Sequence, residues 1–296
     1  MQVTANGINI EVEDHGNSTD PAILLIMGYG TQLVAWPMDF INGLVAAGFR
    51  VVSFDNRDVG LSYKCEGVAA PGPLRQIFTK RFFPSQNLAP YNLSDMAHDA
   101  IGVLDALEID KAHIVGASMG GMIGQLIAAD YAERVLSFVP IMSSTNAPGL
   151  PGATPKVRKG LIQSARAKAT SLEEALTVGM AFSSIIASEE GRAREDERKA
   201  LMKIALQRSF YPAGRQRQMA AIIETGNLRP KTKVISVPTL VIHGTSDPLI
   251  PHPCGEDIAA NVNNARLELI DGMGHDLPPS KLPIMVDLIA GHCRAA

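Results

Sequence analysis

The feature that most restricts the fold of this chain is a regular alternation of short apolar runs with helical patterns. Nearly continuous apolar runs lie at 22–27, 50–54, 113–116, 135–141, 239–243 and 266–270. Runs of this length and composition are typical of parallel strands that are covered on both faces. Helical patterns lie between or after them, at 36–47, 94–107, 119–129, 255–261 and 281–290. The alternation predicts an α/β fold with a mostly parallel central sheet flanked by helices.

The alternation stops between residues 144 and 235. Three prolines, Pro148, Pro151 and Pro155, lie at the start of this stretch, and the patterns that follow are helical and more charged. No clear strand-like run occurs there. We therefore predict one α/β core in two parts, residues 1–143 and 236–296, with a helical cap inserted over residues 144–235.

Composition and charge exclude several classes of protein. The chain is 46% hydrophobic and 19% charged, which excludes a disordered protein. Its net charge of −3 gives no indication of a basic surface that would bind nucleic acid. The N-terminal residues have no basic flank and no apolar run, so we predict no signal peptide. The cysteines Cys65, Cys254 and Cys293 show no C-x-x-C spacing. We expect a cytoplasmic protein with free thiols, whose oligomeric state the sequence leaves open.

Residues 112–129 imitate a membrane span. This run of 18 residues contains no Lys, Arg, Asp or Glu, and 18 residues is the lower limit for crossing a bilayer. It also contains His113, Ser118, Gln125 and four glycines. A buried strand that turns sharply into a buried helix accounts for the same run, so we predict no membrane span.

The most informative motif lies inside this run. Residues 114–121 read Ile-Val-Gly-Ala-Ser-Met-Gly-Gly, which places Ser118 in a G-x-S-x-G pattern between a predicted strand and a predicted helix. A serine in this context occupies a tight, strained turn that projects its hydroxyl beyond the sheet, and the flanking glycines keep side chains away. The helix N-terminus behind it favours developing negative charge. We predict that Ser118 is a nucleophile.

A nucleophilic serine needs a general base and an acid that orients the base. His275 lies on the glycine-rich loop 271–276 after the last predicted strand, and Asp247 follows the preceding strand. The loop after the strand next to the serine offers no carboxylate. The chain order Ser118, Asp247, His275 is that of the nucleophile-elbow class. We predict this catalytic triad, and we expect His243, at a strand end, to take no part in the chemistry.

Backbone groups would stabilise the oxyanion. The N–H of Met119, directly after the serine, is one predicted donor. The other is the N–H of Tyr29, in the loop Gly28-Tyr29-Gly30 after the first apolar run. The two glycines, Gly28 and Gly30, are predicted to let the substrate approach the backbone. Losing one such donor typically costs about 3–4 kcal/mol of transition-state stabilisation. We predict no metal site and no cofactor.

Several segments resemble the α/β-hydrolase fold family. Residues 55–62 look like the D-x-R-G-x-G-x-S segment of that family, with Asp58 in place of the usual glycine, and Met27 stands where many members have histidine. These departures, together with residues 89–97, resemble the aclacinomycin methylesterase group of carboxylesterase-like proteins. The resemblance implies a serine carboxylic-ester hydrolase with a helical cap over the site, and it does not fix the ester. We predict that the enzyme cleaves a small, largely apolar carboxylic ester through an acyl-enzyme.

Other functions use the same residues. A carbon–carbon bond hydrolase or a cofactor-free haloperoxidase would keep the triad, and a non-catalytic ligand-binding protein is compatible with it. The basic residues of the insertion are expected to form a solvated face, with orientation of a substrate anion by Arg208, Tyr211, Arg215 and Arg217 as the alternative.

Residues 80–83, Lys-Arg-Phe-Phe, form a distinctive basic and aromatic segment. No amphipathic helix is predicted around it. We therefore expect a loop that buries its two phenylalanines against the cap, in preference to a patch that faces lipid.

Overall fold

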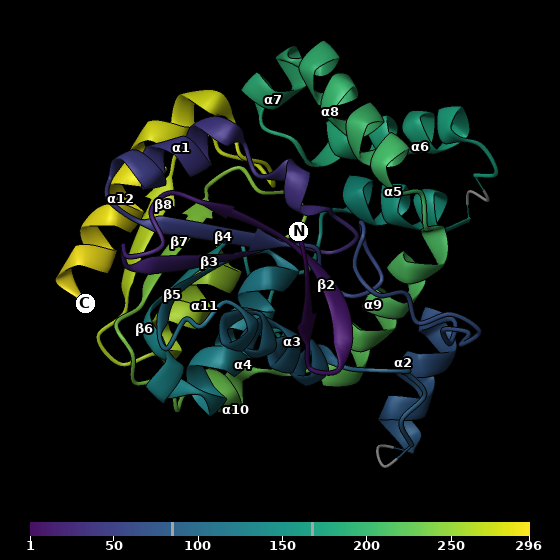
Figure 1. The fold of residues 1–296 in the computed structure, drawn as a ribbon. Helices are drawn as coiled ribbons and strands as arrows, with labels where there is room; N and C mark the ends of the chain where they lie inside the picture. The colour runs from purple at the N-terminus through teal and green to yellow at the C-terminus, as the bar shows by residue number, and fades with distance from the viewer. Residues whose placement is uncertain (84–85, 167–168) are drawn as a thin grey trace.

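Eight strands form a single sheet in the order β1-β2-β4-β3-β5-β6-β7-β8 (Figure 1). The computed structural model describes residues 1–296 except 84–85 and 167–168. The strands are β1 (Gln2–Ala5), β2 (Ile8–His15), β3 (Ala22–Ile26), β4 (Arg50–Phe54), β5 (Ala112–Ala117), β6 (Val135–Ile141), β7 (Leu240–Gly244) and β8 (Arg266–Ile270). Only the pairs β1–β2 and β2–β4 are antiparallel. The predicted mostly parallel sheet is confirmed.

Helices cover both faces of this sheet. Those outside the insertion are α1 (Met38–Ala46), α2 (Pro73–Phe82), α3 (Leu93–Ala106), α4 (Met119–Asp130), α11 (Pro253–Asn261) and α12 (Leu282–Ala295). In Figure 1, α1 and α12 lie on one face, whereas α3, α4 and α11 lie on the other. Each face has its own apolar cluster, and every residue of β3, β4, β5 and β7 is buried. This double coverage explains why these strands are apolar runs rather than alternating patterns.

Helices occupy the described part of the stretch between β6 and β7, and it contains no strand. They are α5 (Pro155–Arg166), α6 (Leu172–Ile186), α7 (Glu189–Ala193), α8 (Glu195–Arg208), α9 (Pro212–Thr225) and α10 (Arg229–Thr232). In Figure 1, α5 to α8 gather at one end of the sheet and α9 leads back toward α2. We call residues 144–235 the insertion. That it acts as a cap stays a prediction at this point.

The uncharged run 112–129 forms β5, the turn at Ser118 and most of α4. The predicted sequence of buried strand, sharp turn and buried helix is therefore confirmed. Among the described residues, no helix combines the length and the apolar character that crossing a bilayer requires.

Two local expectations are corrected. The helix expected from residue 94 begins at Leu93 and is capped by Asn92, whose side chain accepts hydrogen bonds from the N–H groups of Ser94 and Asp95. The segment expected as a loop with buried phenylalanines is instead the end of helix α2. Phe82 is 60% exposed and Phe83 53% exposed. The helix packs through its polar side, which leaves these rings outside.

Candidate functional site

The turn between β5 and α4 holds Ser118 in a strained backbone conformation. Its φ of 55° and ψ of −116° are rare for a residue with a side chain. Glycines make this turn possible: a Cβ at Gly116 would collide with the carbonyl of Gly120, and a Cβ at Gly120 would collide with that of Ile26. The Ser118 N–H donates to the carbonyl of Ile141 at 2.9 Å, which ties the turn to the neighbouring strand β6.

The structure brings the three predicted triad residues together from three loops. His275 Nε2 lies 3.1 Å from Ser118 Oγ, and His275 Nδ1 lies 2.7 Å from Asp247 Oδ2. The loop of His275 is held by the insertion, since the His275 N–H donates to the carbonyl of Ile186 at 2.9 Å. The loops converge because β5, β7 and β8 are parallel and end at the same edge of the sheet.

Asp247 is buried and surrounded by hydrogen-bond donors. Its Oδ1 accepts from the N–H groups of Leu249 and Ile250, both at 2.9 Å. Burial alone raises the pKa of Asp247, but the neighbouring His275 and His243 rings and the backbone donors outweigh burial and hold the pKa well below its usual range. The carboxylate is therefore ionised at neutral pH. It keeps a proton on Nδ1 of His275 and leaves Nε2 free to accept the Ser118 proton.

His243 is a neighbour of the triad whose position the sequence did not reveal. Its side chain is fully buried. Its Nε2 lies 2.8 Å from the carbonyl oxygen of Ile250 and 3.7 Å from Asp247 Oδ2. The carbonyl can only accept, so Nε2 carries the proton. His243 thus braces the loop of Asp247 from behind. Its predicted absence from the proton transfer stays a prediction.

The loop that contains the second predicted oxyanion donor lies against the serine. A Cβ at Gly28 would be 3.1 Å from the Cβ of Ser118, which is a tight contact, so a larger residue here would press on the Ser118 side chain. Among the described residues, the N–H groups of Tyr29 and Met119 have no hydrogen-bond acceptor. Gly30 differs, because its N–H donates to Gln218 Oε1 at 2.7 Å.

Gln218, in α9, was not identified from the sequence. It is completely buried, and its Nε2 donates to the carbonyl of Arg57 at 2.8 Å while its Oε1 accepts from Gly30. One side chain from the insertion thus clamps two core loops, including the loop of Tyr29. A buried amide with both ends paired is a rigid support.

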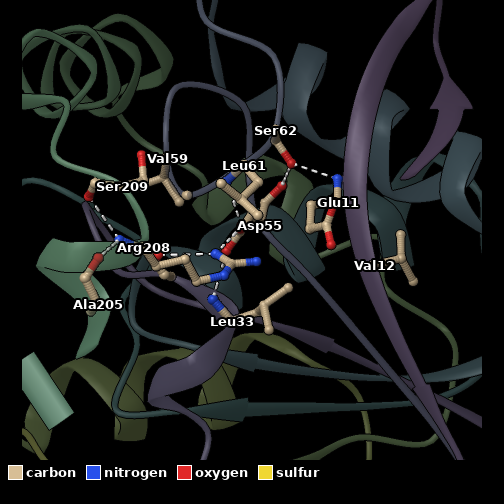
Figure 2. Close-up of polar contacts among 12 residues, drawn as sticks. Glu11, Val12, Leu33, Asp55, Val59, Leu61, Ser62, Ala205, Arg208 and Ser209 are labelled. Atoms are coloured by element: carbon tan, nitrogen blue, oxygen red, sulfur yellow. Dashed lines mark hydrogen bonds and ion pairs between the residues drawn. The ribbon is translucent and has the colours of Figure 1, made fainter. Parts of the chain in front are cut away.

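Two arginines of the insertion form ion pairs with fully buried carboxylates of the core. Figure 2 shows Arg208, whose Nη1 lies 2.5 Å from Asp55 Oδ2. Asp55 is fully buried and also accepts from the N–H groups of Leu33 and Leu61, both at 2.8 Å. The end of α8 is therefore fastened to the loops that follow β3 and β4.

Arg217 makes the second ion pair. Its Nε and Nη2 donate to Asp58 at 2.7 and 2.8 Å, and Tyr91 Oη donates to the same carboxylate at 2.7 Å. Arg217 is only 3% exposed, so the expectation of a solvated face is wrong for this residue. The ion pair with Arg217 also explains why this chain has Asp58 where the D-x-R-G-x-G-x-S segment of the family usually has glycine.

Comparison with known proteins agrees with this architecture. A family model described as alpha/beta hydrolase fold matches residues 21–281. The chain belongs to the α/β-hydrolase fold family. This hydrolase is 26% identical to the rhodomycin D methylesterase DnrP of Streptomyces peucetius, over 99% of the chain and 98% of the relative. It is 27% identical to the 2-hydroxymuconate semialdehyde hydrolase of Pseudomonas sp. strain CF600, over 93% of the chain and 86% of the relative.

Solved structures show the same fold. The enol-lactonase from Burkholderia xenovorans LB400 matches the hydrolase with a TM-score of 0.75 and 22% identity, over 99% of this chain and 100% of the lactonase. The predicted resemblance to the α/β-hydrolase family is confirmed, and the similarity to methylesterases agrees with the predicted group.

Proposed function

We propose that this hydrolase cleaves carboxylic esters of small, largely apolar substrates through an acyl-enzyme on Ser118. The observation that carries the proposal is the unbroken contact from Ser118 Oγ to His275 Nε2 and from His275 Nδ1 to Asp247. The similarity to the rhodomycin D methylesterases of Streptomyces peucetius and Streptomyces sp. strain C5 supports an ester as the substrate.

The reaction follows from this geometry in two halves. Ser118 Oγ attacks the ester carbonyl carbon while His275 Nε2 takes its proton, and the proton then passes to the departing alcohol oxygen. Water next attacks the acyl carbon, gives its proton to the same nitrogen, and the acid leaves as Ser118 Oγ is protonated again. The Asp247 carboxylate stabilises the imidazolium in both halves.

The oxyanion of each tetrahedral intermediate would accept hydrogen bonds from the N–H groups of Tyr29 and Met119. Met119 follows Ser118 directly in the chain, and Gly28, the residue before Tyr29, lies against the Ser118 side chain. Neither N–H group has a hydrogen-bond acceptor among the described residues. Such preorganised donors strengthen as negative charge develops, so they favour the transition state over bound substrate.

We further propose that the insertion is a cap that shapes the substrate pocket. Its contacts support this role, because Ile186 holds the loop of His275 and Gln218 holds the loop of Tyr29. The insertion therefore touches the loops on both sides of Ser118. A segment placed in this way can exclude water and select substrates.

Hydrolysis of p-nitrophenyl acetate by wild type, Ser118→Ala and His275→Ala tests the proposal. We expect each variant to lose at least roughly a thousandfold in kcat, as loss of a triad member does elsewhere. The matched control is His252→Ala, which removes a partly exposed histidine whose side chain pairs with Glu256 and makes no hydrogen bond with the triad among the described residues, and it should keep wild-type turnover. Wild-type turnover by Ser118→Ala would contradict the proposal.

Labelling with a fluorophosphonate separates catalysis from mere binding. An activated Ser118 should be labelled in the wild type and not in Ser118→Ala. A wild-type protein that resists the label would favour a non-catalytic ligand-binding function instead, because the serine would then not be activated.

A carbon–carbon bond hydrolase is the second candidate. The similarity to the 2-hydroxymuconate semialdehyde hydrolase favours it, because the same three residues can serve this reaction. Comparison of kcat/KM for 2-hydroxymuconate semialdehyde and for p-nitrophenyl acetate decides between the two. A higher value for the ester supports the first proposal, and a higher value for the semialdehyde supports the second.

A further inference from the structure

Helix α2 packs against the rest of the protein through its polar side. It lies beside α9 at the periphery of the molecule, away from the sheet (Figure 1). Gln76 is 1% exposed, and its Nε2 donates to the carbonyl of Ala220 at 2.7 Å. Lys80 Nζ lies 2.7 Å from Glu224 Oε1. The side of α2 that faces the protein is thus made of polar contacts.

The opposite side of α2 is apolar and faces outward. Four of its large apolar side chains follow the spacing i, i+3, i+4, i+8, which gathers them on one face of a helix. The exposed fractions are 86% for Leu74, 54% for Ile77, 58% for Phe78 and 60% for Phe82, and Phe83 after the helix is 53% exposed. This is the reverse of an ordinary surface helix, and a concentration of apolar surface of this kind marks an interaction site.

The charged residues of α2 itself are all basic. Between Glu66 and Asp95 the sequence contains no Asp or Glu, whereas α2 carries Arg75, Lys80 and Arg81. Lys80 is paired with Glu224, but Arg75 and Arg81 have no acidic partner among the described residues. The local charge therefore opposes the net charge of −3 of the whole chain.

The combination of apolar and unpaired basic side chains selects one kind of partner. A second copy of the chain docked symmetrically through this face would bring two Arg75 and two Arg81 together with no carboxylate on α2 to compensate. An anionic lipid surface offers phosphate groups to the arginines and acyl chains to the phenylalanines. Short helices with these two properties lie in the plane of the membrane interface.

We propose that α2 binds the surface of an anionic lipid bilayer. The rings of Phe78 and Phe82 enter the boundary between headgroups and acyl chains, and Arg75 and Arg81 contact lipid phosphates. This inference does not depend on the proposed function, because the face of α2 that binds lipid makes no contact with Ser118 or its neighbours among the described residues.

Sedimentation with lipid vesicles tests the proposal on the full chain. The vesicles are phosphatidylcholine alone or an equal mixture with phosphatidylglycerol. We expect wild type to bind the mixed vesicles and to release them as salt is raised, since screening weakens contacts with headgroups. Phe78→Ser with Phe82→Ser should weaken binding at least about tenfold, since each ring loses its apolar contact.

Charge and position are tested by two further variants. Arg75→Gln with Arg81→Gln should weaken binding by roughly 25-fold, about fivefold for each charge near an anionic surface. The matched control is Ile284→Ser in α12, where an isoleucine is 50% exposed on another part of the molecule, and it should bind as wild type does. Turnover of a soluble ester should be unchanged in all of these variants.

Tryptophan fluorescence reports insertion directly. The chain has one tryptophan, Trp36, which is 2% exposed and is therefore insensitive to lipid. Phe82→Trp should shift its emission to shorter wavelength when mixed vesicles are added. Failure of wild type to sediment with these vesicles, or equal binding by the Phe78 and Phe82 variant, would overturn the proposal. The proposal would also be overturned if the wild type formed a dimer without lipid and Phe78→Ser with Phe82→Ser converted it to a monomer. The face of α2 would then bind a second copy of the chain.

Discussion

Asp58 offers the sharpest test of how the insertion is held to the core. Its φ of +68° lies in the left-handed region that favours glycine. Glycine is also the usual residue at this position of the D-x-R-G-x-G-x-S segment in the α/β-hydrolase family. The buried carboxylate accepts hydrogen bonds from Arg217 and Tyr91. We predict that Asp58→Gly relaxes the backbone and nevertheless destabilises the protein, because it leaves the Arg217 guanidinium buried without an acidic partner.

The magnitude follows from two opposing terms. Replacing a left-handed residue by glycine gains about 1 kcal/mol. Removing one member of a buried ion pair costs about 3–5 kcal/mol, because the other charge stays buried. The hydrogen bonds with Asp58, which outweigh the effect of burial, raise the pKa of Arg217, so this side chain remains charged at any accessible pH. The expected net loss in the free energy of unfolding is about 2–4 kcal/mol.

Equilibrium unfolding in guanidinium chloride measures this loss in wild type, Asp58→Gly, Arg217→Met and the double variant. The double variant should be less destabilised than the sum of the two single variants, because it removes both charges together. An Asp58→Gly protein as stable as wild type, or strictly additive effects, would refute the reasoning.

Three further predictions concern the site and its surroundings. Gln218→Leu should lower kcat more than tenfold with little change in KM, because the loop of Tyr29 acts mainly in the transition state; a change confined to KM would contradict this. Asp247→Asn should lower kcat by about 10⁴, as measured with p-nitrophenyl acetate, and a loss below tenfold would show that the carboxylate is not needed. Burial, with a smaller effect of His292, lowers the pKa of His113 from 6.5 to about 4. The folded state therefore binds this proton more weakly, and stability should fall by about 3 kcal/mol between pH 6.5 and 4. His113→Gln should flatten this part of the stability profile, and an unchanged slope would contradict the assignment.

The arrangement of the triad was predictable because it depends on chain order and strand ends. In a parallel sheet, the segments that follow the strands meet at one edge, so the loops of Asp247 and His275 had to approach Ser118. The glycines at 116 and 120 indicated the sharp turn directly. These are local signals, and the structure places the three side chains accordingly.

The contacts that join the insertion to the core were not predictable in this way. Gln218 reaches Arg57 across 161 residues of sequence, and Arg208 reaches Asp55 across 153. No local pattern relates such partners, because their pairing follows from how helices pack in three dimensions. Basic residues on a helical segment look the same whether they face solvent or a buried carboxylate.

Helix α2 shows how an ordinary rule can give the wrong orientation. Large apolar side chains usually lie inside a protein, so the sequence predicts Phe82 and Phe83 against the cap. The helix instead docks through Gln76 and Lys80, whose partners Ala220 and Glu224 lie in α9. A single sequence gives no sign of these distant polar partners.

The pairing of β6 with β7 joins two strands that are synthesised at different times. Ile141 pairs with Ile242, so the partner strand leaves the ribosome about a hundred residues later. At roughly 5–20 residues per second, this takes about 5–20 s. We expect β6, nearly all of which is buried in the finished sheet, to have an open edge during that interval, which other chains can join. Translation speed through the insertion therefore sets how long each nascent molecule is exposed to aggregation.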